Sequence, residues 1–107
     1  MSEKIQPKSF FDLIKTSKKP ILVDFYADWC GPCKMVSPAI EKVAKDFSGK
    51  LMTIKINVDN KQHVAMKYQI QSIPTIMMFK NGESVMRLTG AQSYEVIKQE
   101  VQKNLLF

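Results

Sequence analysis

Two cysteines separated by two residues are the feature of this chain best suited to chemistry. Cys30 and Cys33 are its only cysteines, and residues three apart share a helix face, with Cβ atoms about 5–6 Å apart. Disulfides form when Cα atoms are about 4.4–6.8 Å apart, so this pair can close and reopen with little backbone movement. A disulfide here would be a weak structural staple, because closing so short a loop removes little entropy from the unfolded chain. The spacing therefore favours a pair that cycles between dithiol and disulfide.

A zinc site is the chemical alternative for such a pair. Tetrahedral zinc needs four ligands, and the two cysteines and the single histidine, His63, do not supply them within one chain. A metal shared by the paired motifs of two chains is the exceptional arrangement that would meet the requirement. We expect no metal site, and we expect His63 on the surface of a helix.

The two sulfurs are expected to differ because they occupy different positions at the start of a helix. Cys30 falls at or just before the helix N-terminus, where free N–H groups and the helix dipole stabilise a thiolate, the attacking species. Cys33 lies one turn further in, so we expect it to be more buried and harder to ionise. Gly31 permits a tight turn, and Pro32 stiffens the loop without losing a hydrogen bond. Trp29 is expected to offer substrates an apolar surface beside an exposed Cys30.

A single carboxylate interrupts the apolar run before the cysteines. Residues 21–26 read ILVDFY, a composition typical of a strand buried on both faces, and Asp24 stands within it. Burying an unpaired carboxylate is costly and raises its pKa, which makes Asp24 a functional candidate. A structural acid satisfied by a neighbouring partner is the alternative.

Helices with recognisable boundaries are predicted around this site. Ser9 has the character of a helix start, and Pro20 ends that helix because proline cannot continue it. A long amphipathic helix is predicted after the cysteines, ending at Ser48-Gly49 and kinked at Pro38. Ser93 is expected to cap a last amphipathic helix.

Strands and one further short helix fill the second half of the chain. Alternating apolar residues predict a strand at 52–58, and a short helix is predicted at 60–68. A strand at 76–80 and an antiparallel strand at 84–89 are joined by Asn81-Gly82, a strong two-residue hairpin signal.

The order of these elements predicts an α/β domain of three layers with a mixed central sheet. A strand, a helix and a second strand form a parallel pair with a right-handed crossover, and the hairpin adds an antiparallel edge. We expect residues 1–107 to form a single domain. Chemistry in such sheets gathers at the carboxyl ends of strands, where Cys30 is placed.

The composition argues against nucleic acid and membrane functions. The net charge is +6, but fifteen of the sixteen cations are lysines scattered along the chain and only Arg87 is an arginine. Arginine is the residue that favours recognition of nucleic-acid bases and two-pronged binding of phosphate. No apolar run approaches the ~20 residues of a membrane span. The N-terminus contains no apolar signal region, so we expect a cytoplasmic protein.

Four segments together resemble the thioredoxin family. Residues 23–34, VDFYADWCGPCK, are similar to the family's active-site segment. Ile73-Pro74-Thr75, residues 79–83 and Gly90-Ala91 follow in the family's order and spacing. The resemblance runs from about Pro20 to the C-terminus. It implies the thioredoxin fold, with a sheet of four to five strands flanked by four helices.

The resemblance also implies roles for individual residues. Asp24 would be the buried acid that helps to deprotonate Cys33, and Lys55 would be a lysine near that acid; plain solvent exposure of Lys55 is the alternative. Pro74 would be a cis proline facing the disulfide, and the backbone of Ile73 would pair with the substrate chain. The implied substrate-binding residues are Trp29, Gly31, Pro32, Ile73, Pro74 and Gly90.

Three departures from the family pattern accompany the resemblance. Tyr26 stands where many bacterial members carry tryptophan. The stretch before Ser9 is short and contains Pro7, so the family's first strand is either truncated or absent. The chain has seven methionines, which we interpret as core residues, with Met35 placed to touch substrates.

The activity implied is protein-disulfide reduction. Cys30 would attack a substrate disulfide to give a mixed disulfide, and Cys33 would release the reduced substrate. The partners implied are disulfide-containing proteins and a flavin-dependent thioredoxin reductase that uses NADPH. The domain would be a monomer without a cofactor of its own. A disulfide-forming or isomerising enzyme of the same fold, and a binding subunit that uses the fold as a scaffold, are the alternatives.

Overall fold

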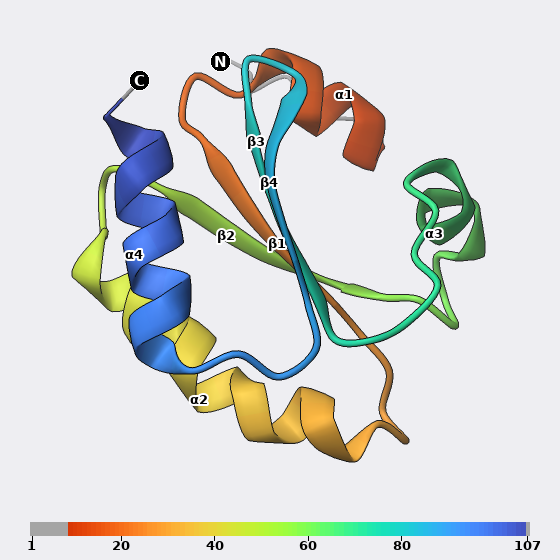
Figure 1. The fold of residues 1–107 in the computed structure, drawn as a ribbon. Helices are drawn as coiled ribbons and strands as arrows, with labels where there is room; N and C mark the ends of the chain where they lie inside the picture. Colours follow the sequence, from red (N-terminus) through yellow and green to blue (C-terminus); the bar gives the residue numbers. More distant parts are fainter. Residues whose placement is uncertain (1–8, 107) are drawn as a thin grey trace, which may run out of the picture.

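The computed structural model describes residues 9–106, which contain four helices and four strands (Figure 1). In chain order they are α1 (Phe10–Thr16), β1 (Ile21–Tyr26), α2 (Gly31–Asp46), β2 (Met52–Asn57), α3 (Gln62–Lys67), β3 (Thr75–Lys80), β4 (Glu83–Thr89) and α4 (Tyr94–Leu105). The strands form one sheet in the order β2-β1-β3-β4. β1 is parallel to β2 and antiparallel to β3, which is antiparallel to β4. The predicted mixed sheet is confirmed.

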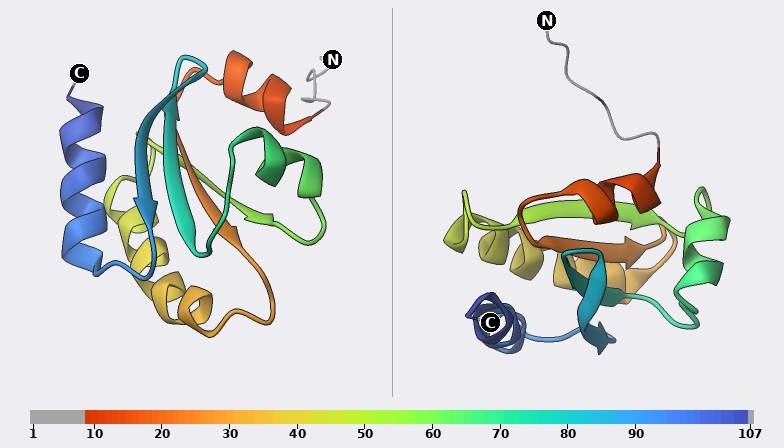
Figure 2. Two further views of the ribbon diagram at one scale, coloured as in Figure 1. Left: turned by 45° about the vertical axis from the view of Figure 1, so that its right-hand side comes forward. Right: turned by 90° about the horizontal axis from the view of Figure 1, so that it is seen from above.

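Helices cover both faces of the sheet and give the predicted three layers. In Figure 1, α2 and α4 lie on one face while α1 and α3 lie on the other, and the left view of Figure 2 shows α4 beside α2. Alternate residues of β1 enter the two cores. Leu22 packs with the α2 and α4 core, whereas Val23 packs with the α1 and α3 core. β1 is therefore buried on both faces, as its apolar sequence predicts.

Local sequence signals account for the ends of several elements. The Oγ atoms of Ser9 and Ser93 each accept a hydrogen bond from the backbone N–H three residues later, at 3.2 Å, which is the N-cap geometry expected of serine. Asn81 and Gly82 both have positive φ angles, 53° and 85°, as a type I′ hairpin turn requires. α2 continues through Pro38 to Asp46.

Two features differ from the prediction. β2 was expected to alternate cleanly, but only Ile56 is buried within it, because β2 is an edge strand of the described sheet. The interpretation of the methionines as core residues is wrong for Met35 and Met66, which are 76% and 77% exposed; Met66 lies on a helix that buries only Val64. Met77, Met78 and Met86 do lie in the cores.

One prediction lies outside the described residues, namely that the family's first strand is truncated or absent. Within residues 9–106, no helix is long and apolar enough to span a membrane.

Candidate active site

The two cysteines lie where β1 ends and α2 begins. Cys30 is the N-cap residue of α2, and Cys33 lies in its first turn. The two form a disulfide with their Cα atoms 5.3 Å apart, within the range that disulfides adopt. The predicted pairing and the predicted position at a strand's carboxyl end are both confirmed.

The start of α2 is arranged to stabilise negative charge on Cys30. The backbone N–H of Cys33 donates a hydrogen bond to the Sγ atom of Cys30 at 3.1 Å. The positive end of the helix dipole acts in the same direction. Pro32 occupies the first turn, where its missing N–H removes no helical hydrogen bond. After reduction, these groups favour the thiolate form of Cys30.

Exposure does not distinguish the two sulfurs in the oxidised protein. Cys30 is 3% exposed and Cys33 is 4% exposed, so the expectation that Cys30 is exposed and Cys33 more buried is wrong for this form. Both cysteines pack with Ala27, and Ile73 and Val58 pack against that cluster. The difference between the two sulfurs is one of hydrogen bonding at the helix end.

Asp24 is buried in β1 on the side of the sheet that α2 covers. It is 1% exposed, and burial raises the pKa of its carboxyl from the ordinary 3.8 to about 6, although the charge of Lys55 opposes the shift. Its Oδ1 atom finds no hydrogen-bond partner among residues 9–106. Such an acid changes its protonation close to neutral pH, which suits it to proton transfer.

A small cavity connects Asp24 with Cys33. Its volume is about 150 Å³, which leaves room for a few waters at ~30 Å³ each. The residues that line it come from β1, β2, the loop after β1 and the first turns of α2, and they are Asp24, Tyr26, Ala27, Asp28, Cys33, Lys34, Ser37 and Lys55. The cavity gives a path for a proton between the buried acid and the inner sulfur.

Lys55 lies beside Asp24, as the resemblance implies. The two residues are register partners in the parallel pair β1 and β2, and both line the cavity. The Lys55 side chain is largely exposed, and its Nζ atom lies 4.6 Å from the centre of the Tyr26 ring. Tyr26 therefore takes a cation–π contact at the position where many family members carry tryptophan.

The expected substrate-binding residues surround the disulfide. Trp29 is 72% exposed, and Gly31 and Pro32 are also exposed. The Ile73–Pro74 peptide bond is cis, as predicted.

Backbone and packing contacts bring the later part of the chain to the same place. Ile73 packs against the two cysteines. The N–H of Gly90 donates a hydrogen bond of 2.8 Å to the carbonyl oxygen of Pro74, so the loop after β4 lies beside the start of β3. Gly90 has a φ of 88°, a conformation that favours glycine.

Two residues near the site were missed from the sequence. The Nε1–H of Trp29 donates a hydrogen bond of 2.9 Å to Oδ2 of Asp59, which fixes one edge of the exposed indole. Val58 packs against the cysteine cluster. Both follow β2 directly, and the carboxyl ends of parallel strands meet at one edge of a sheet. The position of Val58 and Asp59 directly after a parallel strand was the sequence signal that could have identified them.

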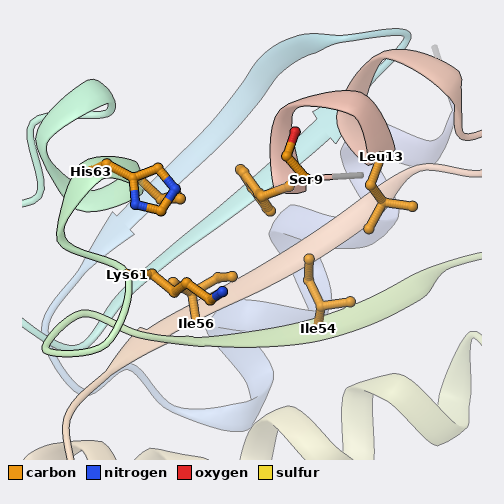
Figure 3. Close-up of a pocket in the computed structure, with 8 residues that line it drawn as sticks. Ser9, Leu13, Ile54, Ile56, Lys61 and His63 are labelled. Carbon is orange, nitrogen blue, oxygen red and sulfur yellow. The ribbon is translucent and has the colours of Figure 1, made fainter. Parts of the chain in front are cut away.

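A larger cavity lies on the opposite face of the sheet and contains none of the predicted site residues. Its volume is about 390 Å³, and its walls come from α1, β2 and the segment that contains α3. Figure 3 shows Leu13 and Ile54 on one side of this cavity, with Lys61 and His63 on the other. His63 is exposed on α3, as expected. Within residues 9–106, no three His, Cys, Asp or Glu side chains gather closely enough to hold a metal.

Comparison with known proteins gives the same assignment along almost the whole chain. The family model "Thioredoxin" matches residues 1–103. Thioredoxin 1 of Chlorobaculum tepidum is 47% identical over 92 residues, which cover 86% of this chain and 91% of that protein. Thioredoxin 1 of Nostoc sp. is 40% identical over 101 residues, 94% of each chain, and thioredoxin of Rickettsia felis is 39% identical over 105 residues, 98% of this chain and all of its own. The chain therefore belongs to the thioredoxin family and is a thiol–disulfide oxidoreductase built on the Cys30–Cys33 pair.

Proposed function

We propose that this protein reduces disulfides in other proteins with distinct roles for its two cysteines. The observation that carries the proposal is the disulfide at the N-terminus of α2, with the inner cysteine in the same cavity as a buried acid. Cys30 is the attacking residue and Cys33 is the resolving residue. Asp24 and Lys55 complete the catalytic set.

The first step is attack by the Cys30 thiolate on a substrate disulfide. A bond forms between Cys30 and one substrate sulfur, and the second substrate sulfur leaves with the electron pair. The N–H of Cys33 and the start of α2 support this role, because both stabilise charge on the Cys30 sulfur.

The second step is attack by Cys33 on the sulfur of Cys30. Cys33 must first lose its proton, and Asp24 is the acceptor, with a pKa of about 6. The Cys30–Cys33 bond forms, the bond to the substrate breaks, and the reduced substrate leaves. Lys55 lowers the pKa of Asp24 through its charge, which keeps a larger share of the acid ready to accept a proton at neutral pH.

Substrate proteins dock on the surface around the disulfide. Trp29 supplies an exposed apolar face held by Asp59, and the backbone of Ile73 pairs with the substrate chain. The remaining docking residues are Gly31, Pro32, Pro74 and Gly90.

The oxidised pair must be returned to the dithiol form after each turnover. We assign this step to a flavin-containing thioredoxin reductase that takes its electrons from NADPH. The protein works as a monomer in the cytoplasm, where the thiol pool keeps cysteines reduced.

A coupled insulin-reduction assay tests this proposal. The protein, NADPH and a thioredoxin reductase are mixed with insulin, and NADPH oxidation is followed together with precipitation of the free insulin chains. We expect turnover that needs all three components and is lost in a Cys30→Ser variant. NADPH consumption that does not depend on this protein would contradict the proposal.

A further inference from the structure

One residue that lines the Asp24 cavity carries a hydroxyl group that the proposed mechanism leaves without a role. Ser37 lies in α2 four residues after Cys33, and residues four apart share one face of a helix. Both line the cavity that contains Asp24. Ser37 is half-buried.

The chemistry of this hydroxyl group suits proton transfer. A serine hydroxyl can donate one hydrogen bond and accept others at the same time. The Oδ1 atom of Asp24 is buried and has no partner among the described residues, so it can accept a bond across the cavity, directly or through water.

The other polar groups that line the cavity are charged side chains and a phenol. Lys55 from β2 and Lys34 from α2 are cationic, Asp28 is a second carboxylate, and Tyr26 adds a phenol. Lys34, Asp28 and Lys55 are exposed. Among the lining residues that come from α2, the helix of Cys33, Ser37 carries the neutral group that can both donate and accept a hydrogen bond.

We propose that Ser37 is a positioning residue that orders the hydrogen-bonded path along which the Cys33 proton reaches Asp24. The inference rests on the proposed roles of Cys33 and Asp24. The Cys33 thiol gives its proton to the Asp24 carboxylate, and the resulting thiolate attacks the sulfur of Cys30. The Cys33–Cys30 bond forms and the Cys30–substrate bond breaks. The substrate sulfur leaves with the electron pair and takes a proton from solvent.

A purely structural role for Ser37 makes a different prediction. Serine within a helix can direct its hydroxyl to the carbonyl oxygen four residues earlier, which here belongs to Cys33. In that arrangement, removal of the hydroxyl leaves the proton path intact, and the pH dependence of the resolving step stays unchanged.

Single-turnover kinetics with an aromatic disulfide separate the two steps. The reduced protein is mixed with less than one equivalent of 5,5′-dithiobis(2-nitrobenzoate). The first release of coloured thiolate reports attack by Cys30, and the second reports resolution by Cys33. The variants are Ser37→Ala, which removes the hydroxyl, and Ser37→Thr, which retains it. Ser48→Ala is the matched control because Ser48 is exposed beyond the end of α2.

We expect Ser37→Ala to slow only the second release, by about threefold to tenfold, as loss of one ordinary hydrogen bond implies. The pH midpoint of that phase should move upward, because Asp24 loses a group that stabilises its charged form. Ser37→Thr should restore rate and midpoint, and Ser48→Ala should match the parent.

Two results would overturn the role of Ser37. One is a second release in Ser37→Ala with the parent's rate and midpoint. The other is a slower release with an unchanged midpoint, because a structural role alone explains it. An Asp24→Asn variant measured alongside separates this inference from the proposed function. If Asp24→Asn also leaves the second release unchanged, the proposed role of Asp24 fails, and the role of Ser37 fails with it.

Discussion

Replacing Asp24 with asparagine tests whether this protein gives up folding stability to keep an acid beside Cys33. The carboxyl is almost completely buried, and its pKa in the folded protein is about 6 against an ordinary value of 3.8. Each unit of pKa corresponds to about 1.36 kcal/mol, so ionised Asp24 lowers the free energy of unfolding by at most about 3 kcal/mol.

The pH dependence follows from where each state releases its proton. Below the ordinary pKa of 3.8, the carboxyl is protonated in both states and contributes no difference. As pH rises from there to about 6, the unfolded chain releases the proton while the folded protein retains it, so stability falls. Above about pH 6 both states are ionised and the loss reaches its plateau.

Asparagine preserves the shape of the side chain and carries no charge. The cost of the parent carboxylate is about 1.6 kcal/mol at pH 5 and about 3 kcal/mol at pH 8. Burial of the asparagine amide offsets part of the gain by an amount that does not depend on pH. The stabilisation by Asp24→Asn should therefore be about 1.4 kcal/mol larger at pH 8 than at pH 5.

Urea unfolding of the oxidised parent and variant at the two pH values measures this difference. Asp12→Asn serves as a control, because Asp12 is an exposed carboxylate on α1. The Asp24→Asn variant should also turn over insulin more slowly near neutral pH, since Cys33 has lost its proton acceptor. A stability difference between Asp24→Asn and the parent that is the same at pH 5 and pH 8 would show that the Asp24 charge is hydrated or paired, and the reasoning would be refuted.

Three further substitutions test the proposed roles near the disulfide. Immobilised Cys33→Ser should trap substrate proteins from a cell extract as mixed disulfides that reductant elutes, whereas Cys30→Ser should trap essentially none; equal capture would reverse the assignment of attacking and resolving roles. Asp59→Ala should release the indole of Trp29, the only tryptophan, and change its fluorescence. The same variant should raise KM for insulin by about threefold to tenfold at unchanged kcat, and an unchanged KM would remove Asp59 from the docking surface.

The fold was predictable because local and long-range signals agree along most of the chain. The serine caps, the Asn81-Gly82 turn and the apolar run of β1 each determine their own element. The alternation of strand, helix and strand then permits few arrangements, since a parallel pair needs a crossover. The exposure of Met66 was not predictable, because α3 is too short for its sequence to show which face it buries.

The residues of the candidate site were predictable to the extent that their chemistry is unusual for their position. Two cysteines at a helix start and a carboxylate in a buried strand are each distinctive. Asp59 and Ser37 are common residue types, and their proposed roles appear only when the chain folds. Asp59 comes within hydrogen-bond distance of Trp29 from thirty residues away, and no local pattern encodes such a contact.

In the proposed mechanism, electrostatics rather than accessibility orders the two steps. Cys30 and Cys33 are equally buried in the oxidised form, so exposure in that form does not identify the attacking cysteine. Cys30 receives the N–H of Cys33, whereas Cys33 shares its cavity with Asp24. In the proposed mechanism, a thiolate at Cys33 and a carboxylate at Asp24 oppose each other within that cavity, and the pair holds one proton between them. Cys33 can therefore become a nucleophile only as Asp24 takes that proton, while Cys30 needs no such transfer and attacks first.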